Sequence, residues 1–284
     1  MKRHDDPATR LPYPSDLTDA QWAQMASCLP PPSEIGGPRL TDFRELCNAI
    51  FYVVREGCQW RALPHDFGIP WATAYWYFRH WQQDGTWTAL HAAFREQVRT
   101  RAGKAATPSA LIIDSQSAKT TAQGGVRGCD VHKQVNGRKR FILVETLGLI
   151  WVRLVLTADQ QERDGGRQLL ERLQALRERF PRLKLIWADG GYAGQLVAWV
   201  ASTCTWVLDI VKKVKPTGFV VLPHRWIVER TYAWFGFFRR LSKDYEVLPT
   251  VSEAMLDVAM IHLMVRRLTG GQVQWRQRSS LLRA

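Results

Sequence analysis

Three acidic residues are placed where the folded chain could bring carboxylates together. Asp114 follows the apolar run 111–113, and Asp189 ends a second apolar run in LKLIWAD. Glu229 lies inside WIVERTYAWFGFF, an apolar and aromatic stretch that predicts a helix. In open sheets, ligand sites usually lie at the carboxyl ends of the strands. We therefore expect Asp114, Asp189 and Glu229 to converge on hard cations, Mg²⁺ or Mn²⁺, most simply two of them.

Carboxylates that hold two divalent ions suit the cleavage of phosphodiester bonds. Such ions activate a nucleophilic water or hydroxyl, stabilise charge on the phosphoryl oxygens and assist the leaving oxygen. Asp114 would bridge both ions, Asp189 would complete one site and Glu229 the other. Gly190 and Gly191, directly after Asp189, would leave room for a DNA backbone.

Each acid also has an ordinary structural explanation. Asp114 could cap a helix or a turn after a core strand, and Glu229 could form a structural ion pair with Arg225 or Arg230. Three further acids are expected in ordinary roles, on the solvent face of a strand, near a helix start and before a basic segment: Glu145, Asp164 and Asp209.

The composition favours a polyanionic partner. The 284 residues include 39 Lys+Arg against 26 Asp+Glu, which gives a net charge of +13 and a pI of about 9.9. Nucleic acid is the first candidate. An acidic membrane surface is the second, but no apolar run reaches the roughly 20 residues of a spanning helix, and the N-terminus lacks a signal-peptide core. We expect a cytoplasmic, nucleoid-associated protein with no membrane partner.

Cysteine and histidine offer no metal or disulfide pattern. The five cysteines are scattered without a CxxC pair, and the seven histidines show no HExxH spacing. These patterns exclude a disulfide framework and the usual zinc hydrolases. Any metal would have to be held by oxygen.

The N-terminal part predicts a small all-helical domain. Thr18 and Gln21 form a capping-box pattern, and apolar residues recur at helical spacing over 41–57, 71–83 and 88–100. We expect residues 1–104 to be a DNA-binding head of helix-turn-helix type. Aromatic residues would form its core, and the candidates for contacts with phosphates or bases are Arg61, Thr73, Arg79 and His80.

Residues 105–284 predict an α/β catalytic domain after the basic linker 99–109. A strand at 111–114, a hairpin of strands at 141–146 and 150–157, and strands at 183–189 and 205–212 alternate with helices. This order predicts a ribonuclease-H-like mixed sheet flanked by helices. A helix over 252–268 and a basic tail would follow.

Basic residues near the predicted site are candidates for DNA contacts. A glycine-rich, solvated loop after Asp114 would present one set: Lys119, Arg127, Lys133, Arg138, Lys139 and Arg140. The predicted Glu229 helix and the segment after it would present the second: Arg225, Arg230, Arg239, Arg240 and Lys243.

Several motifs resemble the DDE transposases of bacterial insertion sequences, in the group named after insertion sequence five. They are DSQSAKTT, GGVRGCDVHKQVNGRKRFILVETLGL, WADGGYAG, VLPHRWIVERTYAWFGFFRRLSKDYE and SEAMLDVAMIHLMVRRL, with SDLTDAQW, NAIFYVVREGCQWRALPHDF and TAYWYFRHW before them. The resemblance covers residues 15–268. It implies a ribonuclease-H-like domain, dependence on Mg²⁺, and Asp114, Asp189 and Glu229 as the DDE acids.

The third motif departs from the family pattern at two positions. Related transposases carry a tyrosine, an arginine, the glutamate and a lysine there, and Arg225 and Glu229 fit. Leu222 and Gly236 stand in place of the tyrosine and the lysine. The candidates for the missing positive charge are Arg239, Arg240 and Lys243.

The expected function is therefore DNA transposition. The protein would bind the terminal inverted repeats as a homodimer or higher oligomer, hydrolyse strands at the ends of the element and join the 3′ hydroxyl to double-stranded target DNA. Two alternatives remain: a structure-selective or repair nuclease on the same fold, and a DNA-binding protein that keeps the fold without catalysis. A nuclease would cut DNA without joining it.

Overall fold

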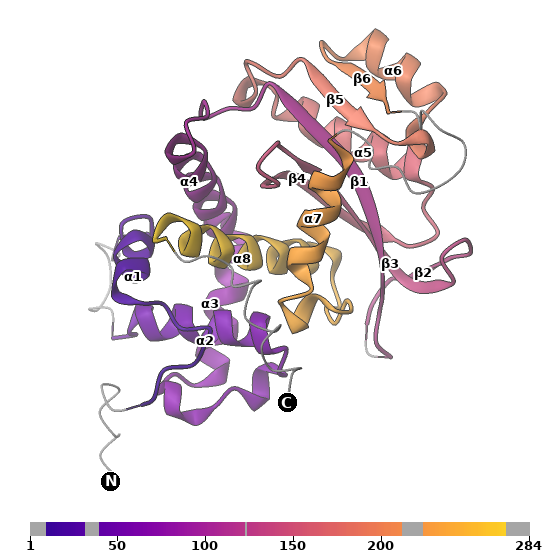
Figure 1. The fold of residues 1–284 in the computed structure, drawn as a ribbon. Coiled ribbons are helices and arrows are strands. Elements are labelled where there is room, and N and C mark those ends of the chain that lie inside the picture. Colours follow the sequence, from indigo (N-terminus) through magenta and orange to yellow (C-terminus); the bar gives the residue numbers. More distant parts are fainter. Residues whose placement is uncertain (1–9, 32–39, 123, 212–223, 271–284) are drawn as a thin grey trace, which may run out of the picture.

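A computed structural model describes residues 10–31, 40–122, 124–211 and 224–270 (Figure 1). The helices are α1 (Asp19–Ala26), α2 (Phe43–Glu56), α3 (Trp71–Gln83), α4 (Thr86–Arg101), α5 (Glu162–Ala175), α6 (Gln195–Thr203), α7 (Arg225–Phe235) and α8 (Pro249–Leu268). The strands are β1 (Ala110–Lys119), β2 (Gly128–Asp130), β3 (Val135–Val144), β4 (Ile150–Thr157), β5 (Leu185–Ala188) and β6 (Val207–Ile210). Short 3-10 helices are η2 (Trp60–Ala62), η3 (His65–Phe67), η4 (Arg177–Arg179), η5 (Gly190–Tyr192) and η6 (Arg239–Leu241).

The strands form one mixed sheet with β1 at its centre. On one side β1 pairs antiparallel with β3. Along its other edge β3 pairs with β2 at residues 135–137 and with β4 at residues 138–144. On the other side β1 pairs in parallel with β5, and β5 in parallel with β6. An antiparallel hairpin on one side of the first strand, and two parallel strands on the other, is the ribonuclease-H-like order predicted above, so that prediction is confirmed.

Alternate residues of the sheet enter two separate cores, as the period of two in a strand requires. Leu111 and Ile113 pack with Phe141 and Leu143 in the core beneath α5 and α6. Ile112 belongs to the opposite core, together with α7 and α8. Because Asp114 follows Ile112 by two residues, its side chain is directed to the face that α7 covers.

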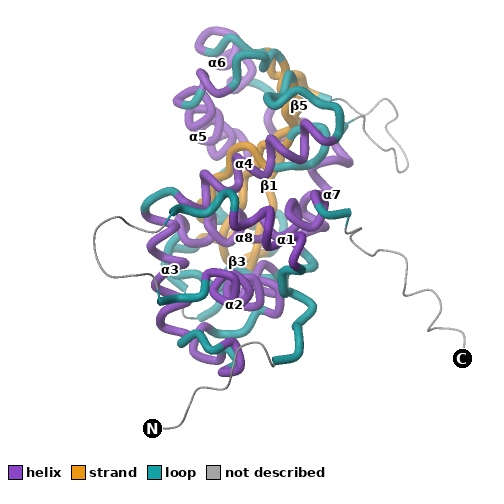
Figure 2. The backbone as a smooth tube through the Cα atoms, turned by 90° about the vertical axis from the view of Figure 1, so that its left-hand side faces the viewer, coloured by secondary structure: helices purple, strands orange, loops and turns teal. Residues whose placement is uncertain are grey.

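The helical N-terminal part shares its hydrophobic core with the α/β part. Helix α8 contacts α1, α2, α3 and α4 on one side and β4 on the other, and buried residues of all these elements form one continuous cluster. Figure 2 shows α2 and α3 at one end of the molecule and α5 and α6 at the other. The division at residue 104 stays a prediction; among the described residues, the helices of the head share one hydrophobic cluster with α7 and α8.

Local signals account for several helix ends. Thr18 and Gln21 make both hydrogen bonds of the predicted capping box at α1. Asp42 caps α2 by accepting from the backbone N–H groups of Arg44 and Glu45, and Gly57 ends that helix with φ +76°.

Two predicted boundaries were wrong. Strand β1 continues beyond Asp114 to Lys119, and β3 begins at Val135 instead of Phe141. The second half of β1 pairs with the first half of β3, from Ser115 opposite Phe141 to Lys119 opposite Gly137. Gly137 permits this pairing because an added Cβ would meet the carbonyl oxygen of Ala118 at 2.0 Å. The pairing therefore takes residues 138–140 out of a loop and into the sheet.

Some predictions fall outside the described residues: Leu222 and the basic run Lys212, Lys213 and Lys215. In the parts of the chain that the structure describes, no helix is both long enough and apolar enough to span a membrane.

Candidate active site

Asp114 lies on the central strand, with its side chain at the surface of the α7 face. Its Oδ1 accepts a hydrogen bond of 2.7 Å from the backbone N–H of Ser115. Its own carbonyl accepts 3.0 Å from the hydroxyl of Tyr232 on α7, which also reaches the carbonyl of Arg140 at 2.8 Å. Burial raises the pKa of the Asp114 carboxyl to about 7, against smaller opposing effects of Ser115 and Arg225.

Asp189 directly follows β5, the parallel neighbour of β1. The parallel register places Ile112 beside Trp187, so Asp114 and Asp189, each two residues further along, come close together. The Asp189 carboxylate also caps η5, because its Oδ1 accepts 2.9 Å from the backbone N–H of Gly191.

Helix α7 adds Glu229 and Arg225, which are four residues apart and so one turn apart on the same face. One guanidinium nitrogen of Arg225 lies 3.3 Å from Asp189 Oδ2, 3.9 Å from Asp114 Oδ2 and 4.0 Å from Glu229 Oε1. The structure therefore brings the three predicted acids around one cationic group. Glu229 is the outermost, with a side chain 62% exposed, whereas that of Asp114 is 14% exposed.

This exposure bears on the structural explanation for Glu229. A structural ion pair of real weight needs a close, shielded contact. Glu229 instead lies at the distance limit from Arg225 and is largely exposed. Arg230, the other suggested partner, lies over the rings of Trp226 and Trp234 at 4.7 and 4.9 Å. The contacts of Glu229 therefore give it little structural role.

The chemistry of the donors suits a hard cation. Carboxylate oxygens are the ligands that Mg²⁺ prefers, and these three already face one positive charge. Among the described residues no three histidine, cysteine, aspartate or glutamate side chains are grouped tightly enough to hold a metal ion as they stand. Arg225 lies among the acids, so a metal there requires its side chain to move.

A fourth carboxylate, Glu162, was missed in the sequence. It lies at the first position of α5, where its Oε1 is 3.3 Å from the hydroxyl of Ser115 and 3.6 Å from Lys133 Nζ. A Cβ on Gly191 would meet its Oε2 at 2.0 Å, whereas Gly190 faces open space. The space beside Gly191 is thus filled by Glu162 and is not available to DNA. The space beside Gly190 is free. Glu162 follows no apolar strand, so no local pattern marked it.

Four of the predicted DNA contacts were wrong, because these side chains lie inside the protein. Arg138 and Arg140 are 0% and 2% exposed, and their guanidinium groups bond to Asp244 and to the carbonyls of 241, 243, 246 and 247. Lys139 bonds to the carbonyl of Gln160 and pairs with Asp130. Arg240 pairs with Glu246 at 2.8 Å. The two arginines on β3 hold the 239–249 segment against the sheet, and Lys139 links β3 to β2.

Other predicted contacts remain available at the surface. Lys119 and Lys243 are exposed and line a groove of about 380 Å³ that also includes Gln116, two residues from Asp114. Arg127, Lys133 and Arg239 are exposed as well. Lys243 and Arg239 therefore stay candidates for the missing charge of the third motif, and Arg240 does not.

None of the three alternative acids pairs with Arg225 within the described residues. Glu145 was expected on a solvent face; it is fully buried and bonded to Arg99, because α4 covers that edge. Asp164 is exposed in the first turn of α5, and Asp209 is exposed on β6.

One relative is encoded by an insertion element. The "Insertion element IS402 uncharacterized 16.2 kDa protein" of Burkholderia cepacia is 29% identical over 113 residues, which cover 38% of this chain and 76% of the relative.

Solved structures of the Mos1 transposase align only loosely. A pre-cleavage Mos1 transpososome covers 84% of this chain and 81% of its own, at 8% identity and a TM-score of 0.30. The Mos1 strand transfer complex covers 85% and 82%, at 9% identity and a TM-score of 0.32. Scores this low establish no common fold, so the fold assignment depends on the strand order.

Family models match most of the chain. The model described as "Putative transposase of IS4/5 family" matches residues 17–91. The model of the transposase DDE domain matches residues 105–264, more than half of the chain and all three acids. The chain belongs to the transposases with a DDE domain, and its N-terminal part is similar to the putative transposases of the IS4/5 family.

Proposed function

We propose that this transposase binds the terminal inverted repeats of its element, hydrolyses DNA strands there and joins the freed 3′ hydroxyl to target DNA. The observation that supports this proposal is the convergence of Asp114, Asp189 and Glu229 on one guanidinium. Three oxygen donors from two adjacent strands and a covering helix are what paired divalent ions require.

Asp114, Asp189 and Glu229 are the proposed ligands of two Mg²⁺ or Mn²⁺ ions. When bound, the ions would polarise the phosphoryl group and lower the pKa of the attacking water or hydroxyl. Asp114 on the central strand and Asp189 after the neighbouring strand would hold the ions from the sheet, and Glu229 would hold them from α7. Tyr232 would hold the backbone at Asp114 in place through its 3.0 Å hydrogen bond.

Arg225 would change partner during the reaction. Its guanidinium offsets part of the negative charge of the acids in this structure, and its side chain is 20% exposed, so a rotation about its side-chain bonds would free it for a DNA phosphate. Lys119 and Lys243, in the groove beside Gln116, would bind neighbouring phosphates of the same strand. These side chains position the DNA.

An assay of strand joining tests the proposal. The purified protein would be incubated with Mg²⁺, a target plasmid and DNA carrying the ends of the flanking element. Transposition gives end DNA covalently joined to the plasmid, and Asp114→Asn should remove both cutting and joining. Two copies are expected on the DNA, one for each end, which cross-linking of the complex would show.

The same assay separates the two alternatives. A nuclease would produce cut ends with no joined product. A silent DNA-binding protein would retain the DNA in a gel shift with no metal-dependent cleavage. Either result would replace the proposed function.

A further inference from the structure

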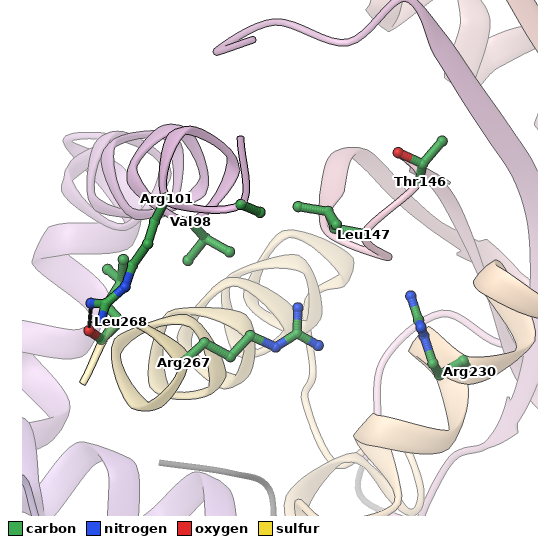
Figure 3. A pocket seen from close by; sticks show the side chains of 8 residues that line it. Val98, Arg101, Thr146, Leu147, Arg230, Arg267 and Leu268 are labelled. Atoms are coloured by element: carbon green, nitrogen blue, oxygen red, sulfur yellow. Dashed lines mark hydrogen bonds between the residues drawn. The ribbon is translucent and has the colours of Figure 1, made fainter. Parts of the chain in front are cut away.

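A pocket with an uncompensated positive charge lies where the helical head meets α7 and α8 (Figure 3). Its volume is about 400 Å³, within the range of small-ligand sites. The lining side chains come from four elements far apart in the sequence: Val98, Arg101, Ala102, Thr146, Leu147, Arg230, Arg267 and Leu268.

Arg230 of α7 and Arg267 of α8 point into this space, as Figure 3 shows, and Arg101 of α4 lies at its rim, bonded to the carbonyl of Leu268. Trp234 supports both inner arginines: its ring lies 4.2 Å from the guanidinium carbon of Arg267 and 4.9 Å from that of Arg230. The indole orients the two cations without cancelling their charge.

No carboxylate lies among the lining residues, and among the described residues no ion pair involves Arg101, Arg230 or Arg267. The acid that acts on both inner arginines is Glu145, and it is already bonded to Arg99. Burial and the charge of Arg230 lower the pKa of Arg267 to about 10, so Arg267 stays protonated at neutral pH. The Nε of Arg230 is buried and has no hydrogen-bond partner within the described part of the chain.

A buried guanidinium donor without a partner costs free energy unless a ligand supplies an acceptor. Two guanidinium groups that point into one space present several N–H donors, the arrangement that a phosphate group accepts through more than one oxygen. Arg230 also follows Glu229 directly on α7, so the pocket adjoins the candidate active site around that helix.

We propose that Arg230 and Arg267, with Arg101 at the rim, bind a backbone phosphate of the DNA. This proposal deepens the proposed function and depends on it for the identity of the ligand. The pocket would hold the DNA at the junction of the head with α7 and α8, and so fix the distance between the DNA that the head binds and the strand beside Glu229.

The salt dependence of DNA binding tests the pocket. Binding of a fluorescently labelled random-sequence duplex, without Mg²⁺, would be followed by anisotropy over a series of salt concentrations. The double variant Arg230→Gln with Arg267→Gln should bind several-fold more weakly and lower the slope of log affinity against log salt by about 1, the value for one lost phosphate contact. The matched control removes the same charge from exposed η4 through Arg177→Gln with Arg179→Gln, and its slope should equal that of the wild type.

If both double variants changed the salt slope equally, the effect would be one of general charge, and the pocket proposal would be overturned. An unchanged slope in the Arg230→Gln with Arg267→Gln variant would also overturn it. If the double variant fails to fold, Arg230→Gln alone replaces it, because Arg267 then keeps its contact with Trp234. A wild-type slope in this single variant would equally overturn the proposal.

Inorganic phosphate serves as the second probe, in a thermal-shift measurement. A phosphate-dependent rise in Tm that the variant loses, combined with an unchanged DNA slope, would assign the pocket to a free anion and overturn the DNA proposal.

The proposed function and the pocket can fail separately. Binding is measured without metal and on random DNA. If the double variant lowers the salt slope although the protein never joins DNA, the pocket proposal is still supported. Joining of DNA by a protein with an unchanged slope would remove the pocket alone.

Discussion

Arg225 and Asp189 form an ion pair of 3.3 Å between the start of α7 and the end of β5. The same nitrogen of Arg225 lies within 4.0 Å of Asp114 and Glu229. The protein therefore carries its own cation among the candidate catalytic acids, and this cation offsets part of their mutual repulsion. This arrangement sets the expected behaviour of the variants below.

Asp114→Asn and Asp189→Asn should each abolish cleavage and leave DNA affinity nearly unchanged. The acids are proposed to hold metal, while separate basic side chains hold phosphate. Gel shifts and cleavage assays on the same preparations measure both properties. Asp209→Asn, which alters an exposed acid on the neighbouring strand β6, is the matched control and should cleave normally. Substantial cleavage by Asp114→Asn would remove its bridging role.

Glu229→Gln should leave the Tm of the metal-free protein unchanged, because Glu229 is 62% exposed and only 4.0 Å from Arg225. It should also lose cleavage and part of the rise in Tm on addition of Mg²⁺. Thermal melts with and without Mg²⁺ measure this. A variant that is destabilised without metal, and stabilised by Mg²⁺ as much as the wild type, would place Glu229 outside the active site.

Arg225→Ala should lower the Tm of the metal-free protein by about 2–4 °C, the effect of losing about 1 kcal/mol of ion pairing in a protein of this size. Mg²⁺ should then raise the Tm by more than in the wild type, because the metal no longer competes with the guanidinium for the acids. Arg172→Ala removes another ion pair, to Glu253 at 2.9 Å, and is the control. It should show no enhanced response to Mg²⁺. An equal response in both variants would contradict the competition.

A buried carboxyl at the junction of α4 and α8, that of Asp257, should make a contribution to stability that depends on pH. Burial raises the pKa of Asp257 to about 7 and lowers that of neighbouring His91 well below its ordinary value, and their Oδ1 and Nδ1 atoms are 3.3 Å apart. Between about pH 4 and 7 the folded Asp257 holds a proton that the unfolded chain has lost, so this group's contribution to stability falls as the pH rises. Above pH 7 the loss is complete.

Asp257→Asn removes that dependence and keeps groups that can bond His91 and Arg153. The difference in Tm between variant and wild type should therefore become more favourable to the variant from pH 5 to pH 8. Melts at both pH values check the sign. The opposite trend would show that the ionised Asp257 is stabilised by its ion pair with Arg153.

The head should supply most of the preference for the element's ends. Deletion is unsuitable as a test, because α8 buries its apolar face against α1–α4 and a fragment from Thr107 would expose it. Substitutions on the surface of α3 are suitable: His80 is exposed and stacked on Trp76, and Arg79 is half-buried. Arg79→Gln with His80→Ala should reduce discrimination between end DNA and random duplex in competition gel shifts. Unchanged discrimination would move sequence recognition away from this face.

Local patterns in the sequence determined the elements and the positions of the acids along them. Apolar runs that end in Asp114 and Asp189 predicted two core strands, and the structure ends β5 at Ala188, directly before Asp189, although β1 continues to Lys119. The Thr18–Gln21 capping box and the apolar period of α2 were equally readable. Side-chain periodicity and caps depend on neighbours a few residues away, so one sequence suffices for them.

Only the tertiary structure decided which charges are buried and which meet. The sequence predicts a solvated loop at Arg138 and Arg140. In the structure, the register of β3 against β1 places both residues beneath the 239–249 segment. Helix α5 places Glu162 near the acids, and helices α4 and α8 place Arg101 and Arg267 at the pocket. These helices pack against parts of the chain that are distant in the sequence. The burial of a charge depends on which distant segment covers it, and the spacing of residues along one sequence does not predict that segment.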